Sequence, residues 1–206
     1  MRIKRFVLGE LSTNCYVISD DKTKEAAIID PAVCNERITK YINEEQLVIK
    51  YILLTHSHFD HVMGCSELVQ KYGAKVLIGK DEAELVDVLN SEFTNELISE
   101  SISLDGVLEE GDIINIGNSR LEVIETAGHT PGGISFYTDG ALFSGDTLFK
   151  LSVGRTDFRM GDFDKLSQSI KKLYQYPDET VVYPGHGFTT TIGSEKTSNP
   201  YVRWTK

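Results

Sequence analysis

The chain has 206 residues, 40% of them hydrophobic and 25% charged, which is the composition of an ordinary globular protein and excludes disordered and fibrous classes. Its formal net charge of −10 and pI of about 5.0 disfavour a nucleic-acid partner, because that affinity depends on clustered lysines and arginines. The N-terminal segment MRIKRFVLGELSTN is too weakly apolar for a signal peptide or a membrane span, so we expect a cytoplasmic protein without a membrane partner.

Short apolar or β-branched runs alternate along the chain with amphipathic segments. Helices are predicted over residues 35–45, 61–73 and 162–176. In the last of these, Leu166, Ile170 and Leu173 recur at helical spacing, which indicates a helix that lies on a sheet. Ten runs predict strands, most of them ended by Gly, Asp or Pro: residues 3–8, 15–18, 26–30, 51–55, 75–79, 112–117, 121–126, 133–138, 141–145 and 180–185.

Residues 80–101 are acidic and weakly helical, and they interrupt this alternation. We interpret them as a lid or excursion within one domain that spans residues 1–206, because no repeat, low-complexity tract or flexible linker marks a boundary. Two groups of strands, each with helices that must cover one face, favour a layered α/β sandwich.

The segment LLTHSHFDHVMG, residues 53–64, places three histidines and an aspartate directly after an apolar run. His56, His58, Asp60 and His61 form the pattern H-x-H-x-D-H at the end of a predicted buried strand. Imidazole nitrogen and carboxylate oxygen are ligands of zinc, iron and manganese, and several of them on one short loop indicate a metal site. The alternative, solvated polar residues of a loop, would suit a single histidine better.

Three further residues share this context. His129 and His186, which complete the five histidines of the chain, each follow a predicted strand and are flanked by glycine, as is Asp146 in LFSGDTLF. Glycine lets the backbone approach such a cluster closely. Seven ligands suit two ions, and a sensible division assigns His56, His58 and His129 to one ion and Asp60, His61 and His186 to the other, with Asp146 bridging.

Two ions about 3.5–4 Å apart can hold one hydroxide between them and polarise a carbonyl or phosphoryl oxygen, which is hydrolytic chemistry. No G-x-S-x-G nucleophile motif competes with this interpretation.

The H-x-H-x-D-H motif followed by the later histidine, aspartate and histidine at strand ends resembles the metallo-β-lactamase superfamily over nearly the whole chain. The resemblance implies a four-layer αββα sandwich, with the dinuclear site at one edge between the sheets and the same ligand division. The stretches SVGRTDF, PDETVVYPGHG and TTIGSEKTSNP are similar to the glyoxalase II-like, or hydroxyacylglutathione hydrolase-like, subgroup, which cleaves thioesters. The bridging Asp146 counts, in this resemblance, against β-lactam hydrolysis.

The resemblance therefore implies a dinuclear thioesterase for 2-hydroxyacyl and related S-acyl thioesters, whose expected partner is a small-molecule substrate. Two divalent ions are the expected cofactors, zinc first, with iron or manganese as alternatives. Asp60 is expected to steer the hydroxide as well as to bind metal. Full-length relatives carry a C-terminal helical extension that contacts glutathione, and this chain ends about where that extension would begin. The identity of the thiol carrier therefore stays open. The sequence also leaves the oligomeric state open.

Three cations fall where the family places contacts to the anionic part of its substrate: Lys150, Arg155 and Arg159, with Arg155 preferred. Surface salt bridges are the alternative, and Asp157 is a candidate partner of Arg155. Asp30, which precedes a proline, is expected either to orient a ligand histidine or to initiate a turn.

Other activities stay open. A persulfide dioxygenase shares the fold and the GRTDF stretch and uses one iron, which His56, His129 and Asp146 could bind; the YPGHG and TTIGSEK segments favour the hydrolase instead. A phosphodiesterase or lactonase of the same superfamily shares the motif, but the negative charge disfavours a nucleic-acid substrate. A non-catalytic binding module is the least favoured alternative, because every ligand is present.

Overall fold

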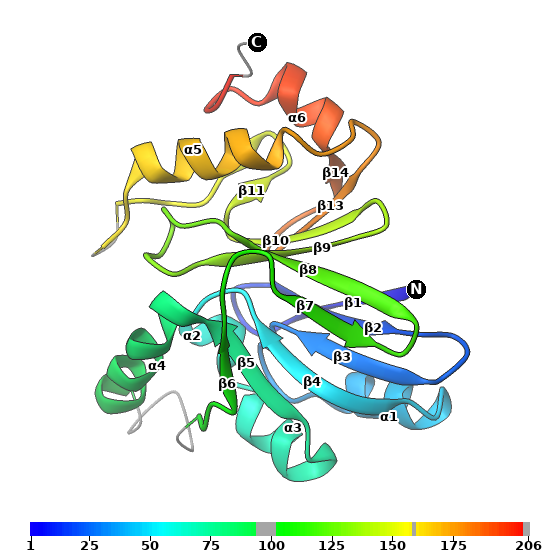
Figure 1. Ribbon diagram of the computed structural model, residues 1–206. Helices are drawn as coiled ribbons and strands as arrows, with labels where there is room; N and C mark the ends of the chain where they lie inside the picture. Colours follow the sequence, from blue (N-terminus) through cyan, green and yellow to red (C-terminus); the bar gives the residue numbers. More distant parts are fainter. Residues whose placement is uncertain (94–101, 158–159, 204–206) are drawn as a thin grey trace.

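Two six-stranded sheets lie face to face, and helices cover the outer side of each (Figure 1). The computed structural model describes residues 1–93, 102–157 and 160–203. The strand orders are β1-β2-β3-β4-β5-β6 and β14-β13-β10-β9-β8-β7. This arrangement confirms the predicted αββα sandwich.

The first sheet is antiparallel from β1 to β3 and parallel from β3 to β6. Helices lie between its parallel strands along the chain, as such crossovers require, and pack on its outer side. The strands are β1 (Arg2–Leu8), β2 (Thr13–Ser19), β3 (Glu25–Ile29), β4 (Val48–Leu54), β5 (Lys75–Gly79) and β6 (Gly106–Leu108). The helices are α1 (Glu36–Glu44), α2 (Phe59–Val62), α3 (Cys65–Tyr72) and α4 (Lys80–Phe93).

The second sheet is antiparallel except where β10 pairs with β13. Its outer side is covered by α5 (Phe163–Leu173) and α6 (Ile192–Ser198) (Figure 1). Its strands are β7 (Ile113–Ile116), β8 (Ser119–Glu125), β9 (Ile134–Thr138), β10 (Ala141–Gly145), β13 (Val181–Pro184) and β14 (Thr190–Thr191), and a small hairpin adds β11 (Leu148–Phe149) and β12 (Ser152–Val153).

The layers follow from the pleat of the strands, which sends successive side chains to opposite faces. In β3, Ala26 and Ile28 face the helices of the first sheet, whereas Ala27 and Ile29 face the second sheet. Strand β4 continues the pattern, with Leu53 fully buried between the sheets. Strands buried on both faces explain why these segments are continuously apolar in the sequence.

The ten predicted strands are all present, but the helix predicted over 61–73 is split into α2 and α3. The backbone of Ala32 intervenes: its N–H donates to the carbonyl of His61 (3.1 Å), and its carbonyl accepts from the N–H of Gly64 (2.7 Å). Those groups would otherwise form intrahelical hydrogen bonds. The prediction also missed α6 and the strands β6, β11, β12 and β14, which are too short to show a periodic pattern.

The acidic stretch 80–101 begins as α4, which contacts β5 and buries Val86. Residues 94–101 lie outside the described residues, so the lid stays a prediction. Among the helices of the described ranges, none is both long and apolar enough to cross a membrane.

We expect Leu53→Ala to lower the free energy of unfolding by about 2–5 kcal/mol, because it removes a side chain buried between the sheets. The control Val48→Ala, at the exposed start of the same strand, should change it by less than about 1 kcal/mol. Chemical denaturation measures both. Equally small losses would contradict a core position for Leu53.

Candidate metal centre

The seven predicted ligands meet at one edge of the sandwich, beyond the C-terminal ends of β4, β10 and β13. Open α/β sheets commonly bind ligands at such strand ends. The ligands come from the loop after β4 and helix α2, from the β8–β9 loop, and from the ends of β10 and β13: His56, His58, Asp60, His61, His129, Asp146 and His186.

The side chains form groups whose ligand atoms lie within 4.8 Å of one another. One group is His56, His58 and His129; a second is Asp60, His61 and His186; a third, of His56, His61 and Asp146, joins them. The carboxylate of Asp146 lies between the first two groups: its Oδ1 is 3.5 Å from His61 Nε2, and its Oδ2 is 3.6 Å from His129 Nε2 and 3.5 Å from His186 Nε2. These groups match the division proposed from the sequence.

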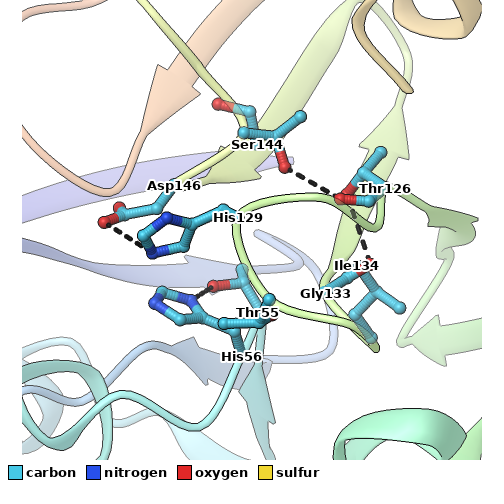
Figure 2. Close-up of a pocket in the computed structure, with 10 residues that line it drawn as sticks. Thr55, His56, Thr126, His129, Gly133, Ile134, Ser144 and Asp146 are labelled. Atoms are coloured by element: carbon cyan, nitrogen blue, oxygen red, sulfur yellow. Dashed lines mark hydrogen bonds and ion pairs between the residues drawn. The ribbon is translucent and has the colours of Figure 1, made fainter. Parts of the chain in front are cut away.

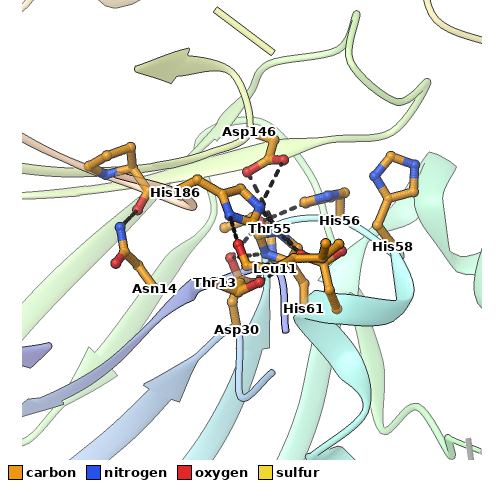
Figure 3. A network of polar contacts seen from close by, with 12 residues as sticks. Leu11, Thr13, Asn14, Asp30, Thr55, His56, His58, His61, Asp146 and His186 are labelled. Atoms are coloured by element: carbon orange, nitrogen blue, oxygen red, sulfur yellow. Dashed lines mark hydrogen bonds and ion pairs between the residues drawn. The ribbon is translucent and has the colours of Figure 1, made fainter. Parts of the chain in front are cut away.

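Asp30 orients two of the histidines (Figure 3). Its Oδ2 accepts from His61 Nδ1 (3.0 Å), which leaves His61 Nε2 directed at the cluster. The same oxygen accepts from the hydroxyl of Thr55 (2.8 Å). Because that hydroxyl proton is used, Thr55 Oγ1 accepts from His56 Nδ1 (3.0 Å), and His56 Nε2 carries a lone pair.

Two more histidines are oriented by backbone carbonyls, which can only accept. His129 Nδ1 donates to the carbonyl of Arg155 (2.6 Å), and His186 Nδ1 donates to that of Leu11 (3.2 Å). Both rings therefore present Nε2 to the cluster. His58 differs, because its Nδ1 faces the cluster, 3.0 Å from His129 Nε2.

The residues fit divalent metal ions. Within the described part of the chain, His56 Nε2 and Asp146 Oδ1 are buried atoms with no hydrogen-bond partner, and such atoms need another way to be satisfied. Figure 2 shows His56 and His129 beside Asp146 in a small polar pocket. A Cβ on Gly185 would overlap the Asp146 carboxylate and the His61 ring, so glycine keeps this space open.

Burial sets the charge state of two histidines. It lowers the pKa of His58 to about 4 and that of His56 well below its usual value, with a smaller contribution from neighbouring histidines. Both imidazoles are therefore neutral at physiological pH, which is the form that binds metal.

In the second group, neighbouring carboxylates stabilise the charged form of a histidine. Burial opposes a charge on His61, but Asp146 and Asp30 outweigh it and raise its pKa to about 9. Burial likewise opposes ionisation of Asp60, but hydrogen bonding to His186 and the charge of His61 hold its pKa well below the usual range. The hydroxyl of Thr13 also donates to Asp60 Oδ2 (2.6 Å). In the metal-free chain, His61 is therefore protonated, and its positive charge balances the surrounding carboxylates as a metal ion would.

Two of the three candidate substrate-binding cations, Lys150 and Arg155, fall within the described residues. The guanidinium of Arg155 forms a bidentate ion pair with the carboxylate of Asp157 (2.8 and 2.9 Å), and both side chains are about two-thirds exposed. Lys150 lines a groove with Thr189 to Thr191. Arg159 lies outside the described residues.

Several residues that support the centre were not predicted: Thr13, Thr55, Ser57, Glu82 and the carbonyls of Leu11 and Arg155. Hydroxyl groups and backbone carbonyls occur throughout the chain, so no local pattern distinguishes these. Only the strand-end position of Thr55, next to the histidine motif, offered a signal.

The fold and the donor set define a metal-dependent hydrolase. A profile described as the metallo-beta-lactamase superfamily matches residues 8–186, and the chain belongs to that superfamily.

Three similar proteins are matched over almost their full length. The chain is 36% identical to hydroxyacylglutathione hydrolase GloC of Haemophilus influenzae over 217 residues, which cover 98% of each protein. It is similar to a crystal structure titled BLEG-1 B3 metallo-beta-lactamase, with a TM-score of 0.89, 36% identity and coverage of 98% and 99%. It is also similar to TTHA1623 in a di-iron-bound form, with a TM-score of 0.84, 33% identity and coverage of 97% and 100%.

We expect metal binding to release protons, because His61 must lose its proton to become a ligand and its pKa is raised to about 9. The apparent affinity for Zn²⁺ should therefore rise as the pH increases from 6.5 towards 9. Calorimetric titration at pH 7.5 in two buffers of different ionisation enthalpy counts the protons, and at least one per loaded chain is expected. Binding without proton release would contradict this charge state.

Proposed function

We propose that the chain is a dinuclear metal-dependent thioesterase that hydrolyses S-acyl thioesters, first of all 2-hydroxyacyl thioesters of glutathione. The observation that carries the proposal is the pair of ligand groups sharing Asp146, with their histidine ring nitrogens directed at a common space. The thioester class is supported by the near-full-length similarity to GloC. The negative charge of the chain supports a small-molecule substrate and not a nucleic acid. The cytoplasm is the proposed location.

Ions held there would supply a hydroxide at neutral pH and polarise the scissile carbonyl. The seven side chains would hold two such ions, with Asp146 in contact with both. Asp60 is ionised at every working pH, so it can accept a hydrogen bond from the attacking water and orient it. The hydrogen bonds at Nδ1 already direct Nε2 of His56, His61, His129 and His186 at the site, so metal binding requires no rotation of these rings.

Zinc is the proposed metal, and iron is the alternative. The donors are nitrogen and oxygen only, which both metals accept, and one structural relative is described in a di-iron-bound form.

Arg155 is proposed to contact the anionic part of the substrate. Its backbone carbonyl already touches His129, so its exposed side chain starts beside the centre. Lys150 and Arg159 are further candidates for the same contact.

Hydrolysis of β-lactams is a second candidate, because a relative of 36% identity carries the name of a B3 metallo-beta-lactamase. The bridging position of Asp146 was expected to count against it. Oxygen-dependent chemistry at a single iron is the third.

The test combines elemental analysis of the purified protein with release of free thiol from S-lactoylglutathione. We expect about two metal ions per chain and thiol release. Nitrocefin hydrolysis without thiol release would favour the lactamase instead. One iron per chain, no thiol release and oxygen uptake with a persulfide would favour the dioxygenase.

We expect Asp146→Ala to reduce metal content and thioester hydrolysis together, by at least about tenfold in activity, because it removes the carboxylate common to both groups. Asp164→Ala, which removes an exposed carboxylate in α5, is the control and should behave as the unchanged protein. Full activity with two ions in Asp146→Ala would refute the bridging role.

A further inference from the structure

Glu82 is a fully buried carboxylate in the first turn of α4, and it is not one of the seven ligands. Its Oε1 accepts hydrogen bonds from the backbone N–H of Ser57 (2.8 Å) and from the Ser57 hydroxyl (2.6 Å). Its Oε2 accepts from the backbone N–H of Gly132 (3.0 Å). One carboxylate thus joins two loops that are distant in the sequence.

Both loops carry ligands of the same group. Ser57 lies between His56 and His58, and Gly132 lies on the β8–β9 loop with His129. The distance between these loops determines whether the three imidazoles converge on one ion.

The β8–β9 loop is closed on itself, so a displacement of Gly132 is transmitted along it. The N–H of Thr126 donates to the carbonyl of Gly133 (2.8 Å), and the N–H of Gly128 donates to that of Thr130 (2.9 Å). His129 lies within the inner of these two closures.

The start of α4 packs directly on this loop. A Cβ on Gly132 would overlap the backbone of Asp81 and Glu82, so only glycine permits the approach. The backbone contact and the hydrogen bond to the Glu82 carboxylate therefore both hold Gly132 against the start of α4.

The second ligand group is held by other residues. Asp60 accepts from Thr13, His61 is oriented by Asp30, and His186 donates to the carbonyl of Leu11. These contacts come from the β1–β2 hairpin and the end of β3, and not from α4.

We propose that Glu82 is a positioning residue for the ion held by His56, His58 and His129, and that the ion held by Asp60, His61 and His186 does not depend on it. The inference rests on the dinuclear centre of the proposed function but not on the thioester as substrate.

Glu82→Gln tests this with little change of shape. The carboxylate offers acceptors to all three donors, whereas an amide offers one acceptor oxygen and one donor nitrogen. If the amide oxygen accepts from Ser57, the amide nitrogen faces the N–H of Gly132, and two donors then oppose each other. The bond between the loops is lost while the packing volume is retained.

The experiment measures stepwise Zn²⁺ affinities of the full chain by competition with a chromophoric chelator. Glu82→Gln is expected to weaken one of the two bound equivalents by about tenfold or more and to leave the other unchanged. Glu84→Gln makes the same substitution at an exposed position of the same helix and should match the unchanged protein.

Two backgrounds identify the ion that is affected. Adding Glu82→Gln to His186→Ala, which impairs the second group, should still weaken the remaining ion. Adding it to His58→Ala, which impairs the first group, should cause no further loss. The proposal would be overturned if Glu82→Gln weakened both ions equally or left zinc binding unchanged. A further loss of zinc affinity in the His58→Ala background, or fewer than two ions on the unchanged protein, would also overturn it.

Ser57→Ala keeps the test decisive if Glu82→Gln does not fold. It removes only the hydroxyl donor and leaves the backbone bond to Glu82, so the same ion should weaken by a smaller factor. Unchanged binding of that ion would overturn the proposal. Absence of thiol release by the unchanged protein would refute the thioesterase and would leave these zinc affinities as they are.

Discussion

The centre depends on the buried carboxylate of Asp30, at the point where β3 ends in a left-handed backbone conformation (φ 49°). Its oxygens accept from the backbone N–H of Thr55 (2.8 Å), the hydroxyl of Thr55 and the ring of His61. A buried carboxylate without such donors is strongly destabilising. Satisfying Asp30 therefore joins β3 to the end of β4 and, through the same bonds, orients His61 and His56.

Two further histidines follow the same rule with acceptors from more distant elements. His129 depends on a carbonyl in the segment after β12, and His186 depends on one in the β1–β2 hairpin. His61, His129 and His186 are thus each oriented through Nδ1 by an oxygen that belongs to a different part of the fold. The centre is complete only when both sheets have packed together, so metal affinity and global stability are coupled.

Most of the architecture and the residues that converge at the candidate site could be predicted from the sequence, for identifiable reasons. Strands buried on both faces are long apolar runs, and the histidines are few and all lie beyond strand ends. Glu82 could not be found in this way, because the acidic stretch around it contains several similar carboxylates and only tertiary packing selects one. The helix over 61–73 was predicted as continuous because the interruption comes from Ala32, whose backbone is brought there by the fold.

The contact between Leu11 and His186 joins residues 175 positions apart, and an isolated antiparallel bridge between Thr13 and His186 reinforces it. A chain grows from its N-terminus, so the hairpin that supports His186 is synthesised 175 residues before that histidine. The strands of the first sheet can pair while synthesis continues, but His186 cannot reach its acceptor until those residues have been added. The nascent protein therefore has an incomplete metal centre throughout that interval.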